Sequence, residues 1–114
     1  MTNEEIFMRY VHGFDVSCKS IYRKINHSLR VSKICKKIAI SLNLNDELIE
    51  LAAFIGLVHD IGRFTQWENY HTYNDLKSVD HAMIGIKILF DNNLIKKFIV
   101  DNKYYDIILK AIKC

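Results

Sequence analysis

The sequence contains no proline and only four glycines in 114 residues. Folds rich in hairpins depend on such turn residues, whereas helices tolerate their scarcity well. Half of the residues are hydrophobic and a quarter are charged, which is typical of a globular protein and not of a disordered or fibrous one. The composition therefore favours an all-α fold, and the length favours a single domain over residues 1–114.

Cysteines and long apolar runs are also scarce. The three cysteines, Cys18, Cys35 and Cys114, form no Cys-x-x-Cys pair, which argues against a disulfide scaffold and a thiolate zinc site. The N-terminal Met-Thr-Asn-Glu-Glu is acidic where a signal peptide is basic. No uncharged run approaches the roughly 20 residues that a membrane span requires. We therefore expect a cytoplasmic protein with no membrane partner.

Acidic residues are missing from the stretch between Val16 and Leu42, although the net charge is only +3. The solvated face of one long helix explains this stretch better than a positive field that attracts a phosphate-bearing ligand. No aromatic residues alternate with the basic ones as in a nucleic-acid stacking surface, so nucleic acid is not an expected partner. The basic residues are Lys19, Arg23, Lys24, Arg30, Lys33, Lys36 and Lys37.

Three helices are predicted in the first half of the chain. Thr2 and Glu5 form a capping box for the first helix. The second helix has an apolar stripe that includes His27. Asn45 or Asp46 caps the third helix, which His59 and Asp60 close, with Gly62 as its stop signal. The predicted stripe of the second helix is Cys18, Ile21, Tyr22, Ile25, Val31, Ile34, Cys35, Ile38 and Leu42.

The second half begins with a stretch, residues 63–77, in which helical periodicity fails, so a loop is predicted there. Ser78 is the predicted N-cap of a fourth helix, with Asp80 in its first turn and His81 on its buried side.

Asn92-Asn93 ends this fourth helix, and a short segment over 94–100 follows. Asp101 or Asn102 caps a last helix. That helix reaches Cys114 without a stop signal, which suggests a fragment or a helix completed by something else. Its predicted inward residues are Tyr104, Ile108, Ala111 and Ile112.

The run from Leu51 to Phe64 is nearly uncharged until it reaches His59 and Asp60. Burying these two side chains is costly unless a hydrogen-bonded core site or a metal ion compensates them. A lone histidine is more often a core residue than a ligand. However, His27 and His81 give three helices that bring three imidazoles toward one carboxylate. That set suits a borderline or hard divalent ion such as zinc, manganese, iron, nickel or magnesium.

The pattern His27…His59-Asp60 resembles the opening of the H…HD…D signature of the HD-domain superfamily of metal-dependent phosphohydrolases. The strings His27-Ser-Leu-Arg-Val, Leu57-Val-His-Asp-Ile-Gly-Arg-Phe and Asp80-His-Ala-Met-Ile-Gly are similar to those of small bacterial HD proteins, from about Ser17 onward.

The resemblance implies an all-α bundle, here of about five to six helices, and a divalent metal held by His27, His59 and Asp60. Relatives with a second metal use a histidine placed like His81, in the context His81-Ala-Met-Ile-Gly85, and the resemblance also implies a substrate phosphate facing Arg63. Lys77 is a weaker candidate for the phosphate, since a solvated lysine explains it better.

The signature closes with an aspartate from a later helix, and the sequence stops before such a residue. Asp101 and Asp106 both lie early for that role. The resemblance nevertheless implies hydrolysis of a nucleotide or another phosphorylated small molecule through a metal-activated water. Asp60 would orient that water or take its proton, and His81 would hold a second ion or protonate the leaving group.

Two further hypotheses stay open. One is a catalytically incomplete HD module that binds a nucleotide, a nucleic acid or a protein partner. The other is a homodimer formed through the last helix.

Overall fold

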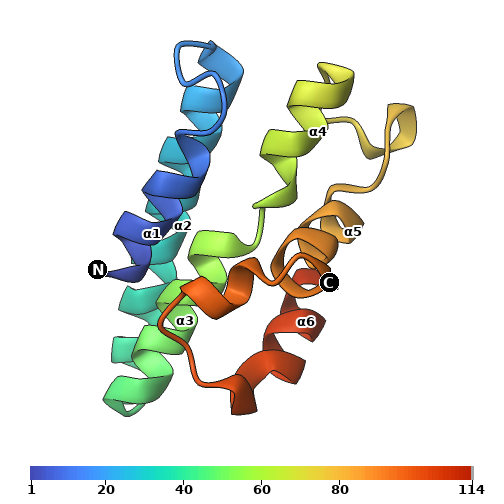
Figure 1. Cartoon of the computed structure of the whole chain (residues 1–114). Coiled ribbons are helices and arrows are strands. Elements are labelled where there is room, and N and C mark those ends of the chain that lie inside the picture. Colours follow the sequence, from blue (N-terminus) through green and yellow to red (C-terminus); the bar gives the residue numbers. More distant parts are fainter. Residues whose placement is uncertain (114) are drawn as a thin grey trace.

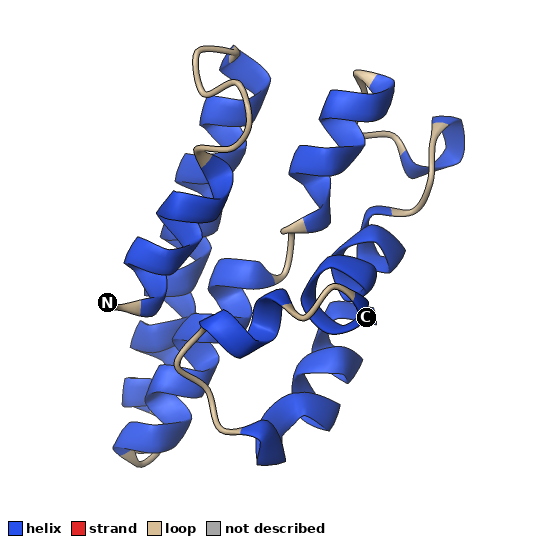
Figure 2. Ribbon diagram, viewed as in Figure 1, coloured by secondary structure: helices blue, strands red, loops and turns tan. Residues whose placement is uncertain are grey.

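The computed structural model describes residues 1–113, and this part of the chain contains helices and no strand. The all-α prediction is confirmed (Figures 1 and 2). A π-helical turn, Lys87–Asp91, extends α5, and three 3₁₀ turns lie at Asp75–Lys77, Leu94–Lys97 and Asn102–Tyr104. The α-helices are α1 (Asn3–Val11), α2 (Lys19–Ser41), α3 (Asp46–Val58), α4 (Gly62–Tyr70), α5 (His81–Ile86) and α6 (Tyr105–Lys113).

Local capping explains where several of these helices begin. The capping box of α1 is present, since Glu5 N donates to Thr2 Oγ1 and Thr2 N donates to Glu5 Oε1. The Asn45 side chain accepts from the third backbone N–H of α3, and Asp101 caps the 3₁₀ turn that leads into α6. Asn93, at φ 62°, follows the turn that ends the extended α5. These sequence predictions are confirmed.

Helices α2 and α3 lie side by side and cross closely (Figure 1). A Cβ atom on Gly56 would lie 2.9 Å from Cys35 Sγ and 3.0 Å from Ser32 Cα, so only glycine fits this crossing. The Ser32 hydroxyl also donates to the carbonyl of Ala53 at 2.7 Å. This crossing holds the C-terminal end of α3 against the middle of α2, where His27 lies.

One apolar core runs through the bundle and includes residues on both sides of His59 and Asp60, which lie between α3 and α4. Each fully buried large aliphatic or aromatic side chain contributes about 1.5–3 kcal/mol. The core therefore fixes the end of α3 from both sides. Its fully buried members include Phe7, Val11, Val58, Ile61, Phe64, Leu89 and Ile108.

The predicted stripe of α2 is wrong at Tyr22, which is 58% exposed, and in its C-terminal half. Ile34, Ile38 and Leu42 are 53%, 54% and 64% exposed. The buried face of α2 instead carries small residues such as Ser28 and Ala39. A hydrophobic pattern gives weight to large side chains, whereas a close crossing requires small ones.

The predicted loop over 63–77 is wrong in its first half, which forms α4. Phe64 and Gln66 are both fully buried in this helix. A buried polar residue hides the helical period, which is why the pattern seemed to fail there. Gly62 begins α4, and α3 already ends at Val58.

The start of α5 also differs from the prediction. Asp80, not Ser78, is its N-cap, because the Asp80 side chain accepts from Ala82 N at 3.0 Å. Ser78 instead receives a hydrogen bond from Gln66.

Two of the predicted inward residues of α6, Ile108 and Ile112, are buried. Cys114 and the predicted continuation of the last helix lie outside the described residues. Within residues 1–113, no helix combines the length and the apolar character that crossing a bilayer requires.

Candidate metal centre

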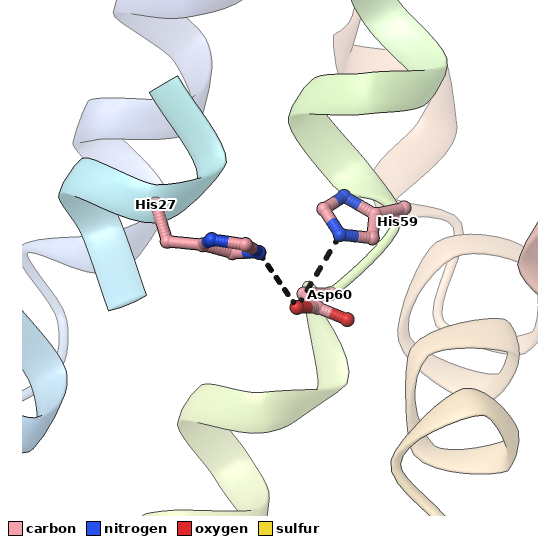
Figure 3. Close-up of side chains that lie close together, drawn as sticks. All are labelled: His27, His59 and Asp60. Carbon is pink, nitrogen blue, oxygen red and sulfur yellow. Dashed lines mark ion pairs between the residues drawn. The ribbon is translucent and has the colours of Figure 1, made fainter. Parts of the chain in front are cut away.

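Three predicted ligands, His27, His59 and Asp60, come together where α3 ends against α2 (Figure 3). The Nε2 atoms of His27 and His59 lie 3.5 and 3.3 Å from Asp60 Oδ2. One ligand atom from each residue lies within 4.8 Å of the others, a spacing at which a metal ion could be held.

The turn after α3 explains how two neighbouring residues reach the same point. Consecutive side chains on a helix point about 100° apart. Val58 is the last residue of α3, and Ile61 N then donates to the Val58 carbonyl while Arg63 N donates to the Asp60 carbonyl. His59 and Asp60 thus occupy a tight turn between α3 and α4, at the helix end that the sequence predicted.

A second hydrogen bond fixes the orientation of the His59 ring. Its Nδ1 lies 2.7 Å from the carbonyl oxygen of Gly56, which can only accept, so Nδ1 carries the proton. The Nε2 atom of a neutral His59 therefore presents a lone pair toward the Asp60 carboxylate. Two acceptors in contact repel each other unless a proton or a metal ion lies between them. Such a backbone bond on the other ring nitrogen is typical of metal-binding histidines, so the donor set fits a divalent ion.

The charges around the site keep Asp60 ionised. Burial by itself would raise the pKa of its carboxyl, but the hydrogen bond and charge of a protonated His59, together with the nearby Lys24, hold that pKa well below its usual range. Burial also lowers the pKa of His59, yet the hydrogen bond and charge of Asp60 raise it on balance. Burial, together with Lys24, lowers the pKa of His27, so that a neutral His27 can donate its lone pair.

Lys24 is a residue of this site that sequence reasoning missed. Its Nζ lies 3.5 Å from Asp60 Oδ2 and 5.1 Å from the centre of the Tyr73 ring. The side chain is only 19% exposed, whereas the sequence placed it on a solvated basic face. The available signal was its position three residues before His27, which puts both side chains on one face of α2.

His81, the first residue of α5, approaches Asp60 from another side. Its Nε2 lies 3.3 Å from Asp60 Oδ1, while the two other histidines contact Oδ2. His81 Nδ1 lies 3.0 Å from Asp75 Oδ2. Asp75, Asp80 and His81 form a second group of residues whose spacing could hold a metal.

Two glycines allow α5 to bring His81 this close. A Cβ atom on Gly62 would overlap the backbone of His81 and lie 2.6 Å from Gly85 N. Gly85 was predicted to permit close approach of another helix, and its neighbour there is Gly62. The start of α4 thereby sets the position of α5.

The two residues predicted to bind a substrate phosphate, Arg63 and Lys77, differ from each other in burial and in contacts. Arg63 is partly buried, and its Nη1 donates to Gln66 Oε1, the Tyr73 carbonyl and Asp75 Oδ1. Its Nε is buried without a hydrogen-bond partner. Lys77 is exposed on the 3₁₀ turn before α5.

The two aspartates weighed for the closing position, Asp101 and Asp106, are both exposed, and Asp101 serves as a cap. Among the described residues, neither belongs to a group with metal-ligand spacing.

A family model described as HD domain matches residues 25–114 of the chain. The match includes His27, His59, Asp60 and His81. Neither a curated protein nor a solved structure matches the chain.

Proposed function

The chain belongs to the HD-domain family, and from this membership we propose that it is a metal-dependent phosphohydrolase. Its substrate would be a nucleotide or another phosphorylated small molecule. The observation that carries the proposal is the contact of the His27 and His59 Nε2 atoms with one oxygen of Asp60. HD domains usually bind divalent metals, and a buried, ionised carboxylate beside two imidazoles is a suitable donor set.

His27, His59 and Asp60 would hold the ion, whose identity among manganese, iron, nickel, zinc and magnesium is left open. A bound divalent ion supplies a hydroxide at neutral pH by lowering the pKa of a coordinated water. The Gly56 carbonyl fixes the His59 ring, and Asp60, with its two oxygens facing different histidines, would orient the nucleophile or accept its proton.

Lys24 is the best-placed cation for a substrate phosphate. Its ammonium group already lies beside an anionic oxygen and is held over the Tyr73 ring. A phosphoryl oxygen near Asp60 would be within its reach, and the positive charge would offset the charge that develops there. Arg63 also remains a proposed phosphate ligand, although three protein acceptors already engage its Nη1. Lys77 remains the weaker one.

His81 would manage the proton of the leaving group or hold a second ion, since its Nε2 faces the second oxygen of Asp60. Both roles require a nitrogen that points into the site, and the contact with Asp60 supports this orientation. A general acid in such a position contributes typically about 10²–10⁴-fold to the rate.

The test is turnover of phosphomonoesters, phosphodiesters and nucleotides with Mn²⁺ added. We expect wild-type protein to be active and His59→Ala and Asp60→Ala to fall to background. His12→Ala is the matched control, because the side chain of this exposed histidine, at the C-cap of α1, contacts only the Met8 carbonyl among the described hydrogen bonds. Equal turnover in wild type and all three variants would refute the proposal.

A specific observation supports a second candidate, an HD module that binds a ligand without turnover. The cluster around Asp60 offers three protein ligands with metal spacing, and Lys24 can neutralise Asp60 without a metal. Protein that purifies free of divalent metal, and that gains no thermal stability from added metal, would favour this candidate.

A further inference from the structure

Asp75 holds His81 from the side opposite Asp60. It lies on the 3₁₀ turn Asp75–Lys77, and its Oδ1 accepts from Gln66 Nε2 at 2.8 Å, Arg63 Nη1 at 3.2 Å and His81 N at 3.0 Å. His81 Nδ1 lies 3.0 Å from the other oxygen, Oδ2, and 3.2 Å from Oδ1. Oδ2 is thus the oxygen nearer to the imidazole, and Oδ1 is the one that the other donors engage.

The first set of contacts prevents the carboxylate from turning. Gln66 is fully buried in α4, and Arg63 is anchored by the Tyr73 carbonyl as well. With Oδ1 engaged by three donors, Oδ2 is the oxygen nearest to the imidazole. Asp75 and Asp60 both only accept hydrogen bonds when ionised. The contacts of Nδ1 with Asp75, at 3.0 and 3.2 Å, are shorter than the 3.3 Å contact of Nε2 with Asp60, so Nδ1 is the donor.

The proton on Nδ1 decides what His81 offers to the site. In neutral histidine, one ring nitrogen carries the hydrogen and the other carries a lone pair, and a hydrogen bond to one of them selects the tautomer. With Nδ1 protonated, the lone pair is on Nε2, which lies 3.3 Å from Asp60 Oδ1.

We propose that Asp75 is a positioning residue: it fixes His81 as the Nδ1–H tautomer and directs the Nε2 lone pair toward the space beside Asp60. The catalytic meaning of this arrangement rests on the proposed function, where His81 binds a cation through Nε2 or, once Nε2 is protonated, gives that proton to the leaving group. The arrangement itself is a property of the chain without any ligand. A carboxylate behind an imidazole is a known way of orienting a histidine ligand and raising its basicity.

A purely structural role for Asp75 uses the same contacts. Asp75 would then only fasten the segment between α4 and α5, and its replacement would lower stability without changing the His81 ring. The tautomer of His81 separates the two roles.

The variant Asp75→Asn distinguishes the positioning role of Asp75 from a purely structural one. The donors Gln66, Arg63 and His81 N select the amide oxygen at the Oδ1 position, which turns the amide NH₂ toward His81 Nδ1. A donor facing Nδ1 favours the Nε2–H tautomer, so we expect the variant to switch His81 from the Nδ1–H to the Nε2–H tautomer. Asp80→Asn is the matched control: Asp80 Oδ1 lies 3.7 Å from Nδ1, and asparagine caps helices as well as aspartate does.

Imidazole ¹⁵N NMR of the metal-free protein, at alkaline pH where histidines are neutral, reads the tautomer directly. We expect His81 as Nδ1–H in wild type and Asp80→Asn, and as Nε2–H in Asp75→Asn. An Nε2–H ring in wild type overturns the proposal even if the variant fails to fold. If folded Asp75→Asn protein keeps the Nδ1–H tautomer of His81, the proposal is also overturned.

Calorimetric titration with Mn²⁺ adds a second readout. Loss of a carboxylate that orients a ligand typically weakens metal binding by about 10–100-fold, so we expect this loss in Asp75→Asn and affinity near that of wild type in Asp91→Asn, which changes an exposed aspartate at the end of the π-helical turn. Equal affinities in the two variants would overturn the positioning role. Absence of turnover in wild type, by contrast, would refute the proposed function and leave the tautomer result standing.

Discussion

Asp60 is the residue on which the charge balance of the site depends. It is 8% exposed, yet it stays ionised because Lys24 and the protonated forms of His59 and His81 place positive charge beside it. An isolated carboxylate at such a position would be strongly unfavourable. A divalent ion could bind the two oxygens of Asp60 and would then neutralise part of the negative charge that these neighbours neutralise in its absence.

Lys24 gives a prediction at this scale. We expect Lys24→Met to raise KM for a phosphorylated substrate by about tenfold or more, since a hydrogen bond to a charged group contributes about 1.5–3 kcal/mol. Methionine keeps the apolar stem that packs near Tyr73. Lys33→Met, an exposed position on the same helix, is the control and should leave KM unchanged. Equal effects of the two substitutions would mean that the general charge of α2, not Lys24, attracts the substrate.

At the scale of elements, the contact between the start of α4 and α5 positions His81 relative to Asp60. Gly62 and Gly85 meet there, but a side chain would be accommodated differently on the two sides. A Cβ atom on Gly62 would overlap backbone atoms, whereas one on Gly85 would lie 3.4 Å from Gly62 N and 3.5 Å from Ile61 Cγ2, which is ordinary contact.

We therefore expect Gly62→Ala to destabilise the fold strongly and to reduce any activity, because backbone atoms cannot yield easily. A penalty of about 1–3 kcal/mol is typical of overpacking. Gly85→Ala should be tolerated or should stabilise α5 by up to about 1 kcal/mol, through its better helix propensity. Urea unfolding measures both effects. Similar losses in the two variants would show that the contact is not as asymmetric as described.

The ion pair between Glu47 and Lys103 joins the first turn of α3 to the segment before α6, with 2.9 Å between Oε1 and Nζ. The hydrogen bond from Lys103 lowers the pKa of Glu47 below its unfolded value. This stabilisation is fully present above the unfolded pKa, near 4.3, and is lost as the pH falls through the lower folded pKa.

We expect the difference in Tm between wild type and Glu47→Gln to be small at neutral pH, because the pair is exposed, and to disappear as the pH falls through the lowered folded pKa of Glu47. Salt near 1 M, where the Debye length is about 3 Å, should reduce the difference in the same way. A difference that persists in acid would assign the effect to helix propensity or packing.

At the scale of the whole molecule, the candidate metal centre joins α2, the end of α3 and the start of α5. An ion bound there would link elements that otherwise meet through the apolar core. Ligands that bind only the folded state raise its stability according to their concentration relative to Kd.

We expect Mn²⁺ at about 100 times its Kd to stabilise the wild type by about 2.7 kcal/mol, an increase in Tm on the order of 10 °C for a chain of this length. A chelator should reverse the increase. Asp60→Ala should abolish it, and Asp106→Asn, an exposed aspartate on α6, should retain it. An equal Tm increase in Asp60→Ala would locate metal binding elsewhere.

The sequence by itself determined the helical class, the caps at Thr2, Asn45 and Asp101, and the placement of His59-Asp60 at a helix end. These features depend on residues within a few positions of one another, so local rules suffice. The joint pattern of His27, His59 and Asp60 also predicted a metal centre, and their convergence agrees with that prediction.

Only the tertiary structure decided which face of α2 is covered, that α4 is a helix, and which groups contact Asp60 and His81. The pair Lys24–Asp60 joins residues 36 positions apart, and Asp75 reaches His81 only because Gln66 and Arg63 hold it. The glycines at the helix crossings set these distances. They add nothing to a hydrophobic pattern, and their effect depends on the partner helix that packs against them.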